Sequence, residues 1–181
     1  MVADQPGRTL YILRHAKSAW SPALGDDFER PLAPRGRRAT PLMAAYLARL
    51  EPTPALVLCS SARRAVETWK LIAPALSDDI AVAFDDDLYL ASAATLLARL
   101  RRVPGTVPAL LLIGHEPGLG RLATRLASEG ERAARTTMAA KFPTAALAVL
   151  RFDDGGWTEI GAHRGRLIAF VTPRDLAADG S

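Results

Sequence analysis

The amino-acid sequence predicts an α/β fold built on a mainly parallel sheet, with an antiparallel hairpin added late in the chain. Apolar runs of strand length alternate with helical patterns over the first two-thirds of the 181 residues. Further on, two strand-like runs flank "DDGG" at 153–156, which is typical of a hairpin turn. The length, with 49% hydrophobic and 23% charged residues, suits one globular domain over 1–181.

Seven short segments are rich in apolar residues and bounded by polar or turn residues, which favours strands. The first, "TLYIL", leads straight into Arg14 and His15. The two runs on either side of "DDGG" are expected to pair as the hairpin. The predicted strands are residues 9–13, 55–59, 80–84, 109–113, 145–152, 157–160 and 167–171.

Helical spacing of apolar residues predicts four helices between these strands. In the first, Thr40-Pro41 is either an N-cap with a first-turn proline or a kink inside a longer helix. The polar stretch 128–142 has no clear period, and we expect a surface connection there, with a flexible lid as the alternative. The predicted helices are 39–50, a helix opening after Ser61, one from Ser92 to about Arg102, and one from about Leu119 to Leu126.

Composition narrows the classes of partner and ligand. The net charge is +4, but the arginines form separate clumps and aromatic residues make up only 6%, so no nucleic-acid-binding face is indicated. Separate arginines suit a small anion or a phosphoryl group. Because no apolar run is long enough to cross a bilayer and "MVADQPGR" does not resemble a signal peptide, we expect a cytoplasmic protein with no membrane partner. The sequence gives no indication of oligomeric state.

Cysteine and motif content point away from metal and nucleotide chemistry. The single cysteine, Cys59, has no partner for an internal disulfide and is expected to pack as a small buried hydrophobe. There is no HExxH, no cysteine cluster and no GxxxxGK[ST]. We therefore expect neither a metal ion nor a cofactor.

Polar residues follow three of the predicted strands at equivalent positions. Arg14 and His15 end the first, Ser60 to Arg64 follow the second, and Gly114 to Gly118, including His115, follow the fourth. The crevice beyond the carboxyl ends of the strands is where open α/β sheets bind ligands. Two of the three histidines should meet there, whereas His163 is expected to be structural.

The same residues belong to motifs that resemble those of a known protein family. "RHAKSAW", "RPLAPRG", "SSARRAVET" and "GHEPGL", in this order, resemble the histidine phosphatase superfamily, in the branch of SixA-type phosphohistidine phosphatases. The resemblance covers nearly the whole chain. It implies a phosphoglycerate mutase-like fold, a three-layer α/β/α sandwich around the mainly parallel sheet.

The resemblance also implies a role for each matching residue. His15 matches the nucleophile that carries a covalent phosphoryl group, and a neutral imidazole is what such an attack requires. Arg14 and Arg64 match the two phosphate-binding arginines, and His115 matches the histidine that donates to the phosphoryl oxygens. Lys17 and Ser18 are expected to complete the substrate-binding rim.

A general acid is harder to assign. Related mutases and alkyl phosphatases place a glutamate after the third strand, where this chain reads "DDDLYLAS" from Asp85 to Ser92. Asp87 and Glu116 are the candidates. Without such an acid, substrates with an easily departing group are favoured, and the P–N bond of phosphohistidine is one.

The leading hypothesis is a metal-independent phosphohydrolase that forms a phosphohistidine intermediate and dephosphorylates phosphohistidine on a protein. One alternative is a phosphatase or mutase for small phosphometabolites. The other is a phosphoprotein-binding module without turnover.

Overall fold

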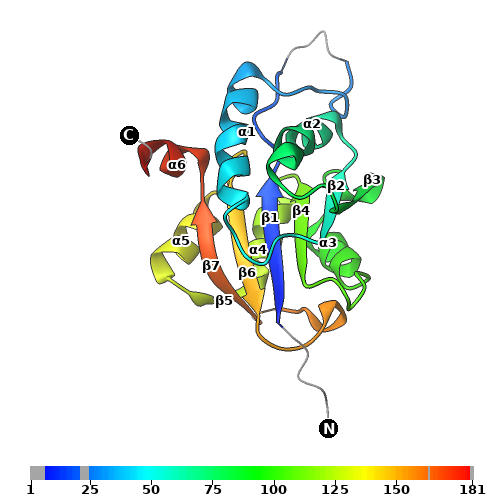
Figure 1. The fold of residues 1–181 in the computed structure, drawn as a ribbon, viewed down its shortest axis with the longest axis vertical. Helices are drawn as coiled ribbons and strands as arrows, with labels where there is room; N and C mark the ends of the chain where they lie inside the picture. The colour runs from blue at the N-terminus through cyan, green and yellow to red at the C-terminus, as the bar shows by residue number, and fades with distance from the viewer. Residues whose placement is uncertain (1–6, 21–24, 163, 180–181) are drawn as a thin grey trace.

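The computed structural model describes residues 7–20, 25–162 and 164–179, which contain a seven-stranded sheet in the order β3-β2-β4-β1-β6-β7-β5 (Figure 1). The strands β3, β2, β4 and β1 run parallel, while β6 is antiparallel to both β1 and β7. The sequence prediction of a mainly parallel sheet with a late antiparallel hairpin is confirmed. The strands are β1 (Arg8–Arg14), β2 (Leu56–Ser60), β3 (Ala81–Asp85), β4 (Ala109–Gly114), β5 (Ala127–Gly130), β6 (Leu147–Phe152) and β7 (Gly165–Val171).

Helices cover both faces of the sheet, which gives the three-layer sandwich (Figure 1). Apolar residues of α1, α2 and α6 pack with Tyr11 and Leu13 on one face, and those of α3, α4 and α5 pack with Leu10 and Ile12 on the other. Successive residues of β1 therefore face opposite layers, as the two-residue period of a strand requires. The helices are α1 (Pro34–Leu47), α2 (Arg63–Ile72), α3 (Ala93–Leu100), α4 (Gly118–Leu126), α5 (Arg132–Ala140) and α6 (Pro173–Asp179).

The extent of the first helix decides between the two interpretations of Thr40-Pro41, a helix start or a proline inside a longer helix. Helix α1 begins at Pro34, so Pro41 lies inside it. The Thr40 hydroxyl donates to the carbonyl of Gly36, one turn earlier. Helices α2, α3 and α4 begin close to their predicted starts, and the Ser92 side chain caps α3 by accepting from the Thr95 amide.

The prediction of a strand at 157–160 is wrong. Residues Trp157–Glu159 form a 3₁₀ helix, and the hairpin partner of β6 is β7. Trp157 and Ile160 are both buried, and the Trp157 indole donates to the Val107 carbonyl. A spacing of three residues between buried side chains fits a helical turn, whereas a strand would alternate them.

The prediction of an irregular surface connection at 128–142 is also wrong. This stretch contains most of β5 and all of α5, and Met138 is buried against the core. Its regular structure depends on neighbours, because β5 pairs with the distant β7 and α5 packs on α4 and β7. No helix in the described part of the chain is long and apolar enough to span a bilayer.

The sheet places the expected site residues at one edge. Arg14 at the end of β1 is level with Gly114 at the end of β4, and Cys59, near the end of β2, is level with Ile113. Cys59 is buried, as predicted. The residues that follow these three strands therefore emerge together.

Candidate active site

A cavity of about 370 Å³ opens at the carboxyl ends of these strands. The side chains around it come from the ends of β1 and β4, the start of α2, and the loops before α1, before α3 and before β6. The lining residues are Arg14, His15, Lys17, Ser18, Asp27, Arg30, Arg64, Leu90, His115, Glu116 and Thr144.

The tautomer of His15 is fixed by its two ring contacts. Nδ1 lies 2.7 Å from the carbonyl oxygen of Ala16, which can only accept a hydrogen bond, so Nδ1 carries the proton. Nε2 accepts from Nε of Arg64 at 3.3 Å. The Nε2 lone pair is thus unprotonated and lies beside a guanidinium.

Burial keeps this imidazole neutral. His15 is 6% exposed, and desolvation is the main cause that lowers its pKa from 6.5 to about 3. The bond to Ala16 opposes that shift, and the positive charges of Arg64 and Arg14 add to it. A neutral imidazole is the form that can act as a nucleophile.

Arg64 and its neighbour Arg63 point to different environments. Arg64 is 3% exposed and, besides its bond to His15, donates to the backbone carbonyl of Asp27 at 2.6 Å. The Arg63 side chain is 50% exposed and pairs with Glu67 at 2.9 Å. Of the two arginines, Arg64 lines the cavity and Arg63 does not.

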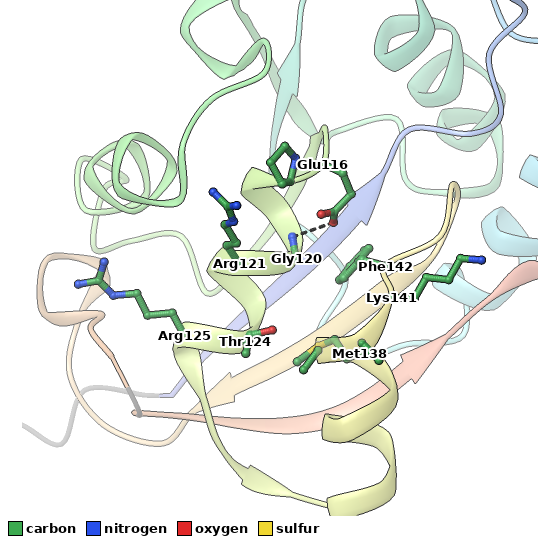
Figure 2. A pocket seen from close by; sticks show the side chains of 11 residues that line it. Glu116, Gly120, Arg121, Thr124, Arg125, Met138, Lys141 and Phe142 are labelled. Carbon is green, nitrogen blue, oxygen red and sulfur yellow. Dashed lines mark hydrogen bonds between the residues drawn. The ribbon is translucent and has the colours of Figure 1, made fainter.

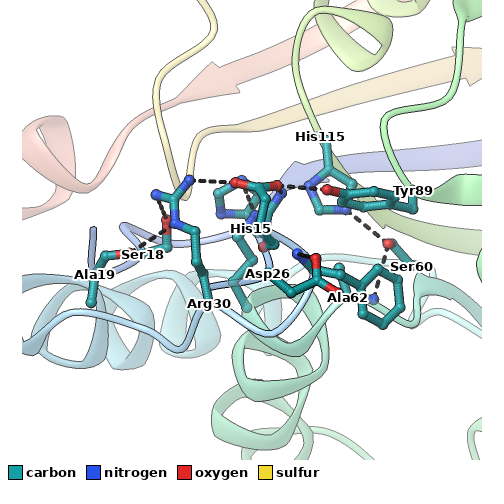
Figure 3. Close-up of polar contacts among 12 residues, drawn as sticks. His15, Ser18, Ala19, Asp26, Arg30, Ser60, Ala62, Tyr89 and His115 are labelled. Carbon is teal, nitrogen blue, oxygen red and sulfur yellow. Dashed lines mark hydrogen bonds and ion pairs between the residues drawn. The ribbon is translucent and has the colours of Figure 1, made fainter. Parts of the chain in front are cut away.

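The second histidine lies against the first. The ring centroids of His15 and His115 are 5.0 Å apart, and Nε2 of His115 is 2.8 Å from the Ser60 hydroxyl (Figure 3). Desolvation, followed by the effects of His15 and Arg64, lowers the pKa of His115 to about 3. The two strand ends predicted to meet do so.

Two buried polar atoms at the cavity have no hydrogen-bond partner among the described residues: Nε of Arg14 and Nδ1 of His115. The Arg14 guanidinium is otherwise held by the Phe142 carbonyl, to which it donates at 2.8 Å. A buried polar group without a partner costs about 1–3 kcal/mol. A bound oxyanion between these groups would satisfy Nε directly, and Nδ1 when that atom is protonated.

A carboxylate that sequence reasoning missed organises the cationic side of the cavity. Oδ2 of Asp27 accepts from Arg64 at 3.0 Å and from the Tyr89 hydroxyl at 2.6 Å, while Oδ1 accepts from Arg30 at 2.6 Å. Arg30 also donates to the Ser18 hydroxyl, a contact that can be followed in Figure 3. The available signal was Arg30 at the head of "RPLAPRG", with an acid three residues before it.

Of the other candidate site residues, some line the cavity and one lies on the surface. Lys17, Ser18 and Glu116 line the cavity, and burial is the main cause that raises the pKa of Glu116. Asp87 is exposed, does not line the cavity, and its amide donates to the Asp85 carboxylate in a 3₁₀ turn. His163 lies outside the described residues.

The histidine pKa values predict acid sensitivity of the fold. Because the folded pKa of His15 lies below its ordinary value, the unfolded chain binds a proton that the folded chain does not as the pH falls below 6.5. We expect the free energy of unfolding to fall as the pH drops from about 6.5 toward about 3, by up to about 1.4 kcal/mol per pH unit for each such group. Urea titrations of the parent and His15→Asn measure this, and equal pH slopes for the two would contradict it.

Neutralising Asp27 should uncouple anion affinity from turnover. In Asp27→Asn the negative charge that competes for Arg64 and Arg30 is gone, so inorganic phosphate should inhibit more strongly. Because Arg64 is less firmly oriented, kcat should fall by about tenfold. Steady-state kinetics with phosphate as inhibitor check both, and unchanged inhibition with unchanged kcat would contradict the organising role.

Sequence comparison matches this chain to a protein family and to an individual protein. The sequence profile of the histidine phosphatase superfamily (branch 1) matches residues 10–89. Uncharacterized protein Rv1276c of Mycobacterium tuberculosis is 37% identical over 164 residues, which cover 90% of this chain and 100% of that protein.

Two solved structures match almost the whole chain. One is assigned as the phosphohistidine phosphatase SixA of Agrobacterium tumefaciens; it is 30% identical, with a TM-score of 0.76 over 93% of this chain and 99% of that one. The other, assigned as SixA of Nakamurella multipartitia, is 25% identical, with a TM-score of 0.82 over 94% of this chain and 98% of that one.

The sheet order and the paired histidines with their arginines define a phosphatase of the histidine phosphatase superfamily, and this chain belongs to that superfamily. Within the superfamily the chain is of the SixA type, since structures of that type align with it from end to end. The family resemblance seen in the sequence is confirmed.

Proposed function

We propose that this phosphatase hydrolyses phosphohistidine on a protein through a covalent phosphoryl intermediate on His15, without a metal ion. The observation that carries the proposal is the state of His15, which lines the cavity: its ring is neutral, its proton is held on Nδ1 by Ala16, and its unprotonated Nε2 lies against Arg64. A binding module has no need of an unprotonated imidazole held in this way.

The reaction has two balanced steps. In the first, the Nε2 lone pair of His15 forms a bond to phosphorus while the P–N bond of the substrate breaks, and the leaving imidazole takes up a proton. In the second, water attacks phosphorus, the bond to Nε2 breaks, phosphate leaves, and His15 returns as the neutral ring. The surplus proton of water passes to the medium or to a carboxylate.

Cationic side chains supply most of the other contributions to phosphoryl transfer. Phosphoryl transfer needs its equatorial oxygens held and neutralised more than it needs further covalent chemistry. Arg64 lies beside Nε2 and Arg14 has a free buried donor, so both can bind these oxygens, and His115 can donate from Nδ1 once the phosphoryl dianion favours its protonation. Guanidinium charges in these positions supply what a metal ion would otherwise supply.

Glu116 is the candidate that can supply the proton for the leaving group. It lines the cavity, and its raised pKa favours the protonated carboxyl compared with an exposed glutamate. The neighbouring charge of Arg14 works against that shift. A modest acid suits a P–N bond better than an alkyl phosphate ester, whose alkoxide leaves with difficulty.

The test is a substrate panel in the presence of EDTA, with a phosphohistidine protein, phosphoramidate and sugar phosphates. We expect the two P–N substrates to be hydrolysed fastest, with no loss on chelation. A clear preference for a sugar phosphate would overturn the substrate assignment. Saturable binding of the phosphoprotein with no turnover and no acid-labile label would overturn the enzymatic one.

A further inference from the structure

A second cavity, about 390 Å³ in volume, adjoins the catalytic one. Lys17 and Thr144 line both cavities. Three more cations, Arg35, Lys141 and Arg174, line the second one, and we call it the basic cavity. A ligand held in the basic cavity would therefore lie next to the phosphoryl group undergoing transfer.

The fold builds the basic cavity from separate parts of the chain. Val171 at the end of β7 is level with Leu147, which is level with Leu13 of β1, so β7 ends at the same edge of the sheet as β1. Arg174 follows immediately in the first turn of α6. Lys141 lies just beyond α5, before the segment that leads into β6.

Close packing brings the first turn of α1 to the same place. The Ala33 amide donates to the Lys17 carbonyl at 2.8 Å, and a Cβ on Gly36 would overlap that carbonyl. The absence of a side chain at Gly36 lets the helix approach the backbone of Lys17. Arg35, the neighbour of Gly36, is held at the cavity as a result.

Within the described part of the chain, the positive charges of the basic cavity are not balanced by carboxylates. Among the described residues, none of its four cations forms an ion pair, and no carboxylate lines it. The acidic residue nearest to Arg174 in the sequence is Asp175. Its carboxylate accepts hydrogen bonds from the amide and the hydroxyl of Thr172. Elsewhere exposed arginines do pair, as Arg63 does with Glu67. Grouped cations repel one another, so a bound anion relieves an unfavourable arrangement.

A third cavity adjoins the catalytic cavity and the basic cavity. Glu116 borders this third cavity, which has a volume of about 490 Å³ and lies between α4 and α5 (Figure 2). Phe142 and Met138 line it, and Lys141 lies on the side opposite Arg121 and Arg125 (Figure 2). Lys141 lines both this third cavity and the basic cavity, so each of the three cavities adjoins the other two. A small metabolite would fill one of them, whereas a polypeptide segment can reach more than one at the same time.

We propose that the basic cavity binds an acidic side chain of the phosphoprotein substrate, close in space to its phosphorylated histidine. This inference rests on the proposed function and specifies it: the preferred substrate carries a carboxylate that reaches Arg35 and Arg174 while its phosphoryl group lies against His15.

The test compares two phosphohistidine peptides that differ only in flanking residues, one with Asp and Glu, the other with Asn and Gln. The parent should show a kcat/KM for the acidic peptide at least about fivefold higher, as expected for two partly screened charge pairs. The advantage should shrink as salt is raised. In the double variant Arg35→Glu, Arg174→Glu it should disappear or reverse.

The control is Arg132→Glu, the same charge reversal in the first turn of α5, away from the basic cavity. An acidic residue in a first helical turn favours the helix dipole, so none of these variants should unfold. Phosphoramidate, which has no second anionic group, should be hydrolysed by every variant at close to the parent rate.

The outcomes separate the two proposals. Equal kcat/KM for the two peptides, an equal effect of Arg132→Glu, or a stronger preference for a small bis-anionic phosphate ester than for the acidic peptide would overturn the inference. Phosphoramidate turnover without turnover of either peptide would overturn it too. Absence of turnover with phosphoramidate and with both peptides would overturn the proposed function, and the inference with it.

Discussion

His15→Asn should lose turnover by about 10³-fold or more, and no acid-labile phosphoryl label should form on the protein. The asparagine amide can still donate to the Ala16 carbonyl, but its nitrogen is not nucleophilic and cannot attack phosphorus. Label formation is measured after exposure to phosphoramidate, followed by acid and base treatment of the trapped protein.

Binding of inorganic phosphate is the control for this variant. Arg14 and Arg64 are unchanged, so phosphate should still bind to His15→Asn, which shows that the cavity has survived the substitution. A label of parental intensity on the variant would mean that another residue carries the phosphoryl group.

The adjacent arginines should behave very differently. Arg64→Ala should lower kcat/KM by about 10²-fold or more, since it removes a guanidinium that lies against the attacking nitrogen. Arg63→Ala should stay within a few-fold of the parent, because that side chain is half exposed and pairs with Glu67 rather than with a residue of the cavity. Consecutive helical residues point about 100° apart, so the pair is its own matched control.

Steady-state kinetics on phosphoramidate, with thermal unfolding alongside, measure this difference. Equal losses in the two variants would show that the phosphate-binding arginine has been misassigned. A loss in Arg63→Ala accompanied by a lower melting temperature would instead trace to the bridge through Glu67 to Arg37 and the Leu32 amide.

Strong local periodicity explains most of what was predictable in the fold. The run around Leu10 to Leu13 is apolar at every position because both faces of β1 are covered, and such a run can hardly be anything but a central strand. Helix α2 was recognisable from Trp69 and Ile72, which bury on one face. Ser92 signalled the start of α3, as N-cap residues do.

The errors arose where distant contacts decide the local structure. Trp157 and Ile160 read as apolar residues of a strand, but their burial beside Val107 selects a 3₁₀ turn. Likewise β5 has little strand character of its own and exists because β7 offers it a partner.

In the site, motifs identified the histidines and arginines that meet at the cavity and missed the carboxylate that holds Arg64 and Arg30. His15, His115, Arg14 and Arg64 each end or follow a strand in a recognisable pattern. Asp27 lies in a polar loop, and its spacing of three residues from Arg30 is the one local signal that separates it from Asp26 beside it. Its three partners come from two other parts of the chain and from its own loop, so only the folded chain shows that it organises the cationic wall.

The sequence by itself determined the order of most of the elements, the family and the four residues that gather at the cavity, because periodicity and short motifs are local properties. The tertiary structure decided the proton position on His15, the choice between Arg63 and Arg64, the role of Asp27 and the grouping of unpaired cations beside Lys17. These depend on burial and on distances between residues far apart in the chain, and such quantities come into existence only when the chain folds.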